Sequence, residues 1–467
     1  MITYQDLRAV PENETDRADF VQKVIREHKQ SDMAQMANIA FEYERCRNVS
    51  IMQRQKYITD LYGKVYRDNL SPVYRMTSNF FYILTTQLNQ YLLGNGVSWE
   101  NGSGDVLGED FDNRIQEAGK AALWGGVSFG FFNLDHVEIF TAKEFAPLLD
   151  EENGGVRAGV RYWQIDETKP LRATLYEEDG YTDYLWSDSD VIDERWAKIG
   201  DRAYARAKTA YISRTRETEA GGEEIYAYEN YPTFPIIPLW GNPHHQSELV
   251  GMREKIDAYD LILNGFEEDL DQAQILWIIK GAGGMDDVDL LQFLDRLRTV
   301  KATAPAEGQD VQPVKIDIPH EAREKLLERI EKQLYRDAMI MNPEDIAGGA
   351  ATATQIRAAY ERQNVKADQY EYCIRDFIAG LLKVSGAEDT PSFTRSTIVN
   401  TQEEVNTVVQ SASYLSSEYV TEKILTLMGD GDKLDEVLQQ MDGEAAERMS
   451  FTAAVEQEGQ GEVILNG

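Results

Sequence analysis

Residues 247–273 carry the pattern that most constrains the fold of this chain. Their apolar residues alternate at spacings of three and four, which places them on one face of a helix: Ile256, Tyr259, Leu263, Phe266 and Leu270. The remaining faces are strongly acidic, with Asp257, Asp260, Glu267, Glu268, Asp269 and Asp271. The segment therefore predicts a long amphipathic helix that has one packed seam and one solvated, negatively charged face.

Two further long helices are predicted downstream. Residues 319–340 carry Leu326, Ile330, Leu334 and Ala338 at a spacing of four, and residues 352–383 form the third helix. Between the first and second helices, residues 274–318 predict a small insert with a strand-like run, a short helix over 286–297 and an extended piece over 311–318. Between the second and third helices, residues 344–351 are small and rich in glycine and alanine.

The remainder of the chain mixes helices with strands. Helical patterns cover residues 14–70, 72–93 and 111–124, and short helices are expected at 402–412, 417–428 and 432–441. Short aromatic or β-branched runs bounded by turn residues predict strands at 129–134, 156–165, 171–176 and 181–186, and a hairpin joining 209–215 to 224–228. The predicted fold class is α+β and mostly helical.

The net charge of the chain excludes one class of function. Of its 467 residues, 81 are Asp or Glu and only 47 are Lys or Arg, which leaves a net charge of −34. A protein that holds nucleic acid by neutralising phosphates needs a surface dominated by Lys and Arg, and so does a protein attracted to anionic lipid. The charge therefore argues against tight binding of DNA, but it does not exclude a protein that works close to DNA.

Cysteine content and hydropathy indicate a reduced, soluble protein. Cys46 and Cys373 are the only cysteines and lie far apart in the sequence, so we expect two thiols and no disulfide framework. The sequence begins without a basic stretch followed by an apolar run, and its apolar runs are far shorter than the ~20 residues of a membrane span. We expect no signal peptide, no contact with membrane, and no cofactor.

Motifs that would indicate an enzyme are weak. The sequence contains no HExxH zinc motif and no GxxxxGK[ST] phosphate loop. Residues 126–130 match the GxSxG pattern of a nucleophile elbow, which requires a strand before the serine and a helix after it. Here a predicted helix precedes Ser128 and a predicted strand follows it, so a tight helix-to-strand turn is the better interpretation.

Two clusters of acidic residues could in principle bind a metal ion. One contains Asp188, Asp190, Asp193 and Glu194, and the other contains Asp430, Asp432 and Asp435. Neither matches a calcium-binding loop. In a chain with 81 acidic residues a solvated surface explains both clusters, and a metal-dependent hydrolase that uses Asp188 and Asp190 remains the weakest alternative.

The order of segments after residue 230 resembles a known family. A proline-rich stretch, Tyr231-Pro-Thr-Phe-Pro-Ile-Ile-Pro-Leu-Trp-Gly-Asn, leads into the acidic helix, whose second half reads Asn264-Gly-Phe-Glu-Glu-Asp-Leu-Asp-Gln-Ala. The insert, the second helix, the loop Ala351-Thr-Ala-Thr-Gln-Ile and a third helix follow in that order. This arrangement, with weaker likenesses at 79–94 and 416–425, resembles the portal proteins of tailed double-stranded-DNA bacteriophages of the siphophage type.

The resemblance implies a ring-forming channel at one vertex of a virion, with about twelve copies of the chain and no enzymatic activity. It implies a wing (1–246), a stem of two helices (247–273 and 319–340) and a clip (274–318). A tunnel loop (341–354), a long wing or crown helix (355–390) and a crown with a C-terminal tail (391–467) complete the assignment. The expected partners are double-stranded DNA in transit, the large terminase, a head–tail adaptor, and the major capsid and scaffolding proteins. The protein would pass through the host cytoplasm during assembly.

The same resemblance supplies candidate site residues. The tunnel loop would present Asn342, Glu344, Asp345, Gly348, Gly349, Thr352 and Thr354 to the DNA, and the free face of the stem would present Asp260, Glu267, Glu268 and Asp271. Lys301, Lys315 and Arg357 are candidate phosphate contacts, because residues 341–354 contain no Lys or Arg. A different virion assembly protein, such as a minor capsid or adaptor component, remains the main alternative.

Overall fold

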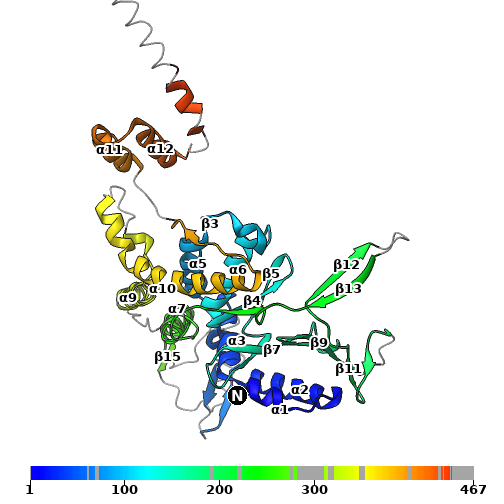
Figure 1. Ribbon diagram of the computed structural model, residues 1–467. Coiled ribbons are helices and arrows are strands. Elements are labelled where there is room, and N and C mark those ends of the chain that lie inside the picture. The colour runs from blue at the N-terminus through cyan, green and yellow to red at the C-terminus, as the bar shows by residue number, and fades with distance from the viewer. Residues whose placement is uncertain are drawn as a thin grey trace, which may run out of the picture. The chain divides into compact units, whose positions relative to one another are not determined.

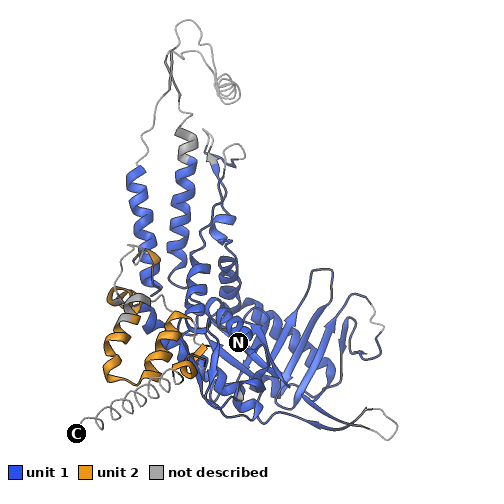
Figure 2. Cartoon of the chain, turned by 90° about the horizontal axis from the view of Figure 1, so that it is seen from above, with its two compact units in different colours: residues 1–341, 362–396 blue, residues 342–361, 397–467 orange. Residues whose placement is uncertain are grey.

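The computed structural model describes most of the chain as a mixed α+β protein (Figure 1). The described residues are 2–59, 63–68, 73–189, 193–217, 223–273, 277–280, 310–313, 320–345, 353–396, 401–429, 433–434, 436–441 and 443. They form two compact units, which Figure 2 colours separately. Unit 1 contains residues 1–341 and 362–396, and unit 2 contains residues 342–361 and 397–467.

A six-stranded antiparallel sheet and the first helices form one core of unit 1. The strand order is β10-β11-β9-β8-β7-β6. Apolar side chains from α2 pack on this sheet, among them Val21, Val24 and Ile25 against Val160 and Leu175. The elements are α1 (Tyr4–Ala9), α2 (Glu14–Gln30), β6 (Phe145–Leu149), β7 (Val156–Trp163), β8 (Leu171–Glu177), β9 (Gly180–Trp186), β10 (Ala197–Lys198) and β11 (Ala203–Ala205).

A three-stranded sheet and four helices form the second core of unit 1. The strand order is β14-β4-β5, and α10 lies so close to β4 that a Cβ atom at Gly130 would meet the ring of Phe377 at 2.5 Å. Tyr370 of α10 donates a 3.0 Å hydrogen bond to Asn89 of α5, and both are buried. The elements are α3 (Asp32–Glu44), α5 (Phe80–Leu93), α6 (Phe111–Gly125), β4 (Val127–Asn133), β5 (His136–Thr141), β14 (Ile236–Trp240) and α10 (Ala353–Ser385).

Smaller elements connect and extend these cores. Four two-stranded antiparallel pairs, β1–β2, β12–β13, β15–β16 and β17–β3, are found among the described residues. Their bounds are β1 (Tyr57–Thr59), β2 (Val65–Arg67), β3 (Val97–Trp99), β12 (Ile212–Glu217), β13 (Glu223–Glu229), β15 (Trp277–Lys280), β16 (Asp310–Pro313) and β17 (Pro391–Phe393). The other elements of unit 1 are α4 (Val49–Met52), η1 (Ser103–Leu107), α7 (Arg253–Ala273) and α9 (His320–Asp337).

Unit 2 contains the first residues of α10 and a group of short helices. These are η2 (Pro343–Asp345), α11 (Thr401–Ser411), η3 (Ala412–Tyr414) and α12 (Ser417–Met428). Ser416 caps α12 by accepting a 3.3 Å hydrogen bond from Tyr419 N, and Gly429 ends it with φ +82°. The first two short helices predicted after residue 400 are therefore confirmed.

Several sequence predictions need correction. The structure contains more strand than a mostly helical fold implies, since β5 and β6 were not predicted and the extended segment before residue 241 is strand β14. Strand β1 (Tyr57–Thr59) pairs with strand β2 (Val65–Arg67), although the sequence predicted helix there. Helix α5 begins at Phe80 and not at Pro72, and α7 begins at Arg253 after a run of turns from Ser247. The short helix predicted over 286–297 lies outside the described residues.

The turn at Gly126 agrees with the sequence interpretation. Gly126 ends α6 with φ +83°, and β4 begins at the next residue. The hydroxyl of Ser128 is fully buried and donates a 2.7 Å hydrogen bond to the carbonyl oxygen of Ala118. The serine is therefore a structural element of the turn and is not presented to a substrate. In the part of the chain that the structure describes, no helix is long and apolar enough to cross a membrane.

Replacing Gly126 tests the close packing at this turn. Gly126→Ala should destabilise unit 1 by roughly 2–4 kcal/mol, because the new Cβ would sit 2.9 Å from the backbone of Gln246 and its φ of +83° disfavours an L-residue. Gly251→Ala is the matched control, since its φ is +79° but nothing lies within 4 Å of the new Cβ, and it should cost only about 1 kcal/mol. Equal losses of unfolding free energy in the two variants, measured by urea denaturation, would contradict this account.

Candidate functional site: two long helices and the turn that follows them

Helices α7 and α9 lie side by side and antiparallel in unit 1 (Figure 2). Lys255 at the start of α7 forms a 2.9 Å ion pair with Asp337 at the end of α9. At the other end of the pair, the ring of Phe266 contacts His320, the first residue of α9. The ring of Phe80 in α5 packs edge-on against Tyr259, a member of the apolar seam predicted for α7, and against Tyr335 of α9.

One face of α7 is a buried stripe of polar side chains. Asp260, Asn264 and Glu268 stand four residues apart, and their exposed fractions are 0%, 0% and 5%. A spacing of four keeps side chains on one face of a helix. We call these three residues the polar stripe.

The polar stripe binds the backbone of an extended segment, residues 73–78. Asp260 accepts a 2.8 Å hydrogen bond from Ser78 N, and Glu268 accepts one of 3.3 Å from Tyr74 N. Between them, the side-chain amide of Asn264 accepts from Met76 N and donates to Met76 O, both at 2.8 Å. The polar stripe therefore satisfies alternate residues of the segment, much as a neighbouring strand would.

The match between helix and segment has a geometric cause. Four residues of a helix rise about 6 Å, and two residues of an extended chain advance about 6.6 Å. Side chains at every fourth position of α7 therefore stay in step with every second residue of the segment over the two repeats observed. The segment cannot be moved along α7 by one residue without leaving a buried polar group unsatisfied, which costs about 1–3 kcal/mol per group.

Glu268 is also the centre of a buried ion cluster. Arg54 donates to its two oxygens at 2.8 and 2.9 Å, and Lys56 Nζ lies 2.9 Å from Oε2. A bidentate arginine with a second cation is a strong arrangement for a buried carboxylate. This cluster connects α7 to the residues that lead into the hairpin β1–β2.

Asp257 and Asp260, near the start of α7, bind side chains of the N-terminal region. Asp257 accepts hydrogen bonds from Tyr43 Oη at 2.5 Å and from Ser50 Oγ at 2.6 Å. Asp260 also accepts from Asn48 Nδ2. Burial raises the pKa of Asp260, and the hydrogen bonds from Asn48 and Ser78 act in the opposite direction. Burial, followed by the hydrogen bond to Asp257, raises the pKa of Tyr43.

The predicted free acidic face of α7 is therefore corrected in part. Asp260 and Glu268 lie inside unit 1, because residues 48–56 and 73–78 cover that side of the helix. Glu267 is half-buried, and the side chain of Asp271 lies outside the described residues. The sequence analysis did not identify Arg54, Lys56 or the segment 73–78, although the i, i+4, i+8 spacing of Asp, Asn and Glu marks the face that binds them.

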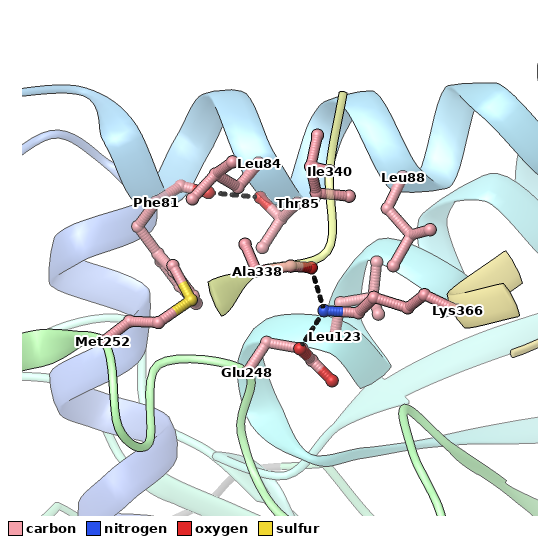
Figure 3. A pocket seen from close by; sticks show the side chains of 10 residues that line it. All are labelled: Phe81, Leu84, Thr85, Leu88, Leu123, Glu248, Met252, Ala338, Ile340 and Lys366. Atoms are coloured by element: carbon pink, nitrogen blue, oxygen red, sulfur yellow. Dashed lines mark hydrogen bonds and ion pairs between the residues drawn. The ribbon is translucent and has the colours of Figure 1, made fainter. Parts of the chain in front are cut away.

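The turn after α9 is held by side chains from two helices, α5 and α10, and from the loop before α7. Lys366 of α10 lies 2.5 Å from Glu248 Oε2 and donates a 2.9 Å hydrogen bond to the carbonyl oxygen of Ala338 (Figure 3). Met341 N donates to Gln363 Oε1, and its carbonyl accepts from Gln87 Nε2, both at 3.0 Å. We call these contacts the turn anchor.

The space around the turn anchor is closely packed. Phe81, Leu84, Leu88, Leu123, Met252 and Ile340 surround Lys366 and leave a cavity of only about 10 Å³. Met339 adopts φ +58°, which is uncommon for a residue with a side chain. The chain therefore leaves α9 in a fixed direction. Sequence patterns offered no signal for this pairing, since Glu248 and Lys366 are 118 residues apart.

The structure describes only part of the predicted loop site. Asn342 is buried and accepts a 3.1 Å hydrogen bond from Glu344 N, while Glu344 itself is exposed. Thr354 and Arg357 are exposed on the first turns of α10. Gly348, Gly349, Thr352, Lys301 and Lys315 lie outside the described residues, as does the side chain of Asp345.

Two acids of the first sequence-predicted cluster form ion pairs, while Asp190 and the second cluster (Asp430, Asp432 and Asp435) lie outside the described residues. Asp188 pairs with Arg202, and Asp193 pairs with Arg195, both at 2.7 Å. Within the described residues, no group of three or more His, Cys, Asp or Glu side chains could hold a metal ion.

Comparisons with known proteins give a consistent result. The sequence model of a family described as "Phage portal protein, SPP1 Gp6-like" matches residues 22–450. The portal protein of Bacillus phage SPP1 is 24% identical over 428 residues, covering 84% of this chain and 80% of that protein. The portal protein of Clostridium phage phiCD119 is 26% identical over 209 residues, covering 42% of this chain and 46% of that protein, so the match spans less than half of the relative's length.

Among solved structures, chains from gene transfer agent particles are similar over much of their length. A chain from the neck of an empty particle has a TM-score of 0.39 at 13% identity, covering 75% of this chain and 90% of that chain. A chain from the virion of a native particle has a TM-score of 0.39 at 14% identity, covering 74% and 89%.

Substitution of Glu268 tests the ion cluster on the polar stripe. Glu268→Gln should lower the free energy of unfolding by about 2 kcal/mol, because Arg54 and Lys56 are then left partly buried without a carboxylate. Glu267→Gln, one residue away and half-buried, is the matched control and should change it by less than about 0.5 kcal/mol. Urea denaturation measures the free energy of unfolding of both variants. Equal losses would contradict a stabilising role for the Glu268 ion cluster.

Proposed function

Because the chain belongs to the SPP1 Gp6-like family of phage portal proteins, we propose that it is the subunit of a ring-shaped DNA channel. Portal proteins of this family are structural components of the virion and not enzymes. In the proposed function, about twelve copies surround a channel at a unique capsid vertex. Double-stranded DNA enters the head through this channel during packaging and leaves through it during ejection.

We assign the parts of the channel as follows. Helices α7 and α9 are the stem, residues 274–318 are the clip, and residues 341–354 are the tunnel loop. Residues 1–246 form the wing, residues 355–390 the long wing or crown helix, and residues 391–467 the crown and tail. The observation that carries this assignment is the antiparallel α7–α9 pair, which is supported along one side by residues 43–56 and 73–78 and is followed directly by the turn anchor.

The net charge supports a channel that does not hold DNA. Each phosphate that a protein neutralises adds affinity for DNA and slows the sliding of the duplex. A channel that must let DNA pass therefore works better with many carboxylates and few cations on its wall. Glu267 and Asp271 are the stem residues that we still propose as channel-facing, now that Asp260 and Glu268 are assigned to the interior. Thr354 and Arg357 are the described residues near the tunnel loop that would lie closest to the duplex.

We propose partners from the same assignment. The clip would bind the large terminase during packaging and a head–tail adaptor afterwards, and the wing would face the major capsid and scaffolding proteins. The motor that consumes ATP would then belong to the terminase, since this sequence contains no phosphate-binding loop of the GxxxxGK[ST] type. The turn anchor would set the direction in which each tunnel loop approaches the DNA.

The oligomeric state tests the proposed function. The purified chain, alone or with scaffolding and capsid proteins, should assemble into rings with a central channel, visible by negative-stain imaging and as one high mass in native mass spectrometry. A monomer under all of these conditions would overturn the proposal. A ring without a long central channel would favour the alternative of a different head assembly component.

Substitution of Lys366 tests the turn anchor. Lys366→Met leaves Glu248 without its ion pair and frees the carbonyl of Ala338, so in vitro packaging of DNA should fall several-fold while rings still form. Lys383→Met, an exposed lysine of the same helix, is the matched control. Gln363→Leu removes only the acceptor for Met341 N and should give a weaker version of the same defect. Normal packaging by both anchor variants would contradict the role of the turn anchor.

A further inference from the structure

Helix α9 carries a row of cations on one side, in a chain whose net charge is −34. Four of its five Lys and Arg residues stand at spacings of four, three and four, which places them on one face of the helix. All four are exposed, and the side chains of the first and the last are 77% and 57% exposed. We call this row the basic face: Lys325, Arg329, Lys332 and Arg336.

The basic face lies opposite the packed side of α9. Leu334 is fully buried and Ile330 is half-buried, and at 3.6 residues per turn both fall on the far side of the helix from the four cations. His320, which contacts Phe266 of α7, falls on that far side as well. The basic face is therefore turned away from α7 and from the interior of unit 1.

The charge of the basic face is only partly balanced by acids of the same chain. Its two end cations have long contacts with acids of α9, at 4.0 Å and 3.5 Å between nitrogen and oxygen. Among the described residues, Arg329 and Lys332 in the middle of the face form no ion pair. The middle of the basic face is thus available to an anion from outside the subunit.

Within unit 1, α9 lies far from the large sheets. In both views it stands on the side of α7 away from the six-stranded and three-stranded sheets (Figures 1 and 2). The proposed function turns the wing, residues 1–246, toward the capsid and hence to the outside of the ring, and both sheets belong to the wing. With the sheets outside, α9 is the stem helix nearer to the channel, and the basic face is turned toward the channel.

We infer that the basic face contacts the phosphates of double-stranded DNA in the channel and slows the sliding of the duplex there. The inference rests on the proposed function, which supplies the ring, the stem around the channel and the DNA. Lys and Arg side chains that neutralise phosphates add affinity for a duplex of any sequence. The acidic remainder of the chain keeps that affinity low elsewhere, so the basic face acts as a brake at one level of a wall that otherwise repels DNA.

The length of the basic face suits a duplex that moves. Lys325 and Arg336 are eleven positions apart, which is about 16 Å along the helix. B-DNA has two backbones and a turn of about 34 Å, so a line parallel to its axis meets a backbone on average every ~17 Å. Each basic face therefore lies close to about one backbone at every position of the duplex. Contact of this kind slows movement evenly and gives the duplex no preferred stopping point.

A second copy of the chain is the competing occupant of the basic face. The residues that cover the other side of α7, 48–56 and 73–78, contain three cations and no acid. A neighbouring copy that presented this flank would repel the basic face. The four cations also offer no apolar side chain for a protein surface to cover. Contact with a neighbouring copy is therefore a separate outcome of the test.

Binding of a fluorescent ~20-bp DNA duplex to purified rings tests the contact. Variant A carries Arg329→Gln and Lys332→Gln, and its rings should bind the duplex ~10-fold more weakly than unchanged rings, with a shallower dependence of affinity on salt. Arg329→Lys with Lys332→Arg keeps both charges and should bind like the unchanged chain. Glu328→Gln removes an exposed acid beside the basic face and should bind more tightly, an effect that a damaged fold would not produce.

The matched control for variant A is Lys23→Gln with Arg26→Gln, an exposed pair at the same three-residue spacing on α2. It removes the same charge from the proposed wing and should leave binding of the duplex unchanged. Equal affinities of variant A and this control would overturn the inference. Failure of variant A to form rings that the control forms, seen by native mass spectrometry, would assign the basic face to the next copy and also overturn it. If the unchanged chain forms no ring, the proposed function is overturned, and this inference with it.

Discussion

The burial of three polar side chains on α7 is the constraint on which the rest of unit 1 depends. A buried carboxylate or amide must find partners inside the protein, because leaving one unsatisfied costs about 1–3 kcal/mol and more when it is charged. Asp260, Asn264 and Glu268 find theirs in residues 48–78. Helix α7 and the N-terminal region therefore have to form together, although about 190 residues separate them in the sequence.

This requirement places the other elements of the site. Once residues 73–78 are fixed along α7, α5 begins at Phe80 and its first aromatic ring reaches both α7 and α9. Gln87, two turns further along α5, then accounts for one of the hydrogen bonds to Met341. The turn anchor is thus built on a helix whose position is set by the polar stripe. A defect at Glu268 and a defect at Lys366 would act on the same chain of contacts from opposite ends.

The sequence predicted the long helices but not what surrounds them. Periodicity identified α7, α9 and α10 because each repeats an apolar face over many turns. It assigned Asp260 and Glu268 to solvent because acidic residues are rarely buried. The partners that make their burial favourable, among them Asn48 for Asp260 and Arg54 for Glu268, lie more than 200 residues away. Strands β5 and β6 were missed because they are short and half-buried, and Pro147 interrupts the pattern of β6. The loop residues named from the family resemblance remain predictions where the structure does not describe them.

The position of each charge now matters more than the total of −34. Glu268 of the polar stripe pairs with Arg54 and Lys56 inside unit 1, and Asp260 is buried there with hydrogen bonds from Asn48 and Ser78. The charge of Glu268 is therefore balanced within the subunit, and in the proposed channel the field along the DNA comes from a smaller set of acids that includes Glu267. A buried ion pair such as Glu268–Arg54 is screened less by salt than exposed carboxylates are. Raising the ionic strength should then weaken the field in the proposed channel sooner than it weakens the attachment of Arg54 to α7.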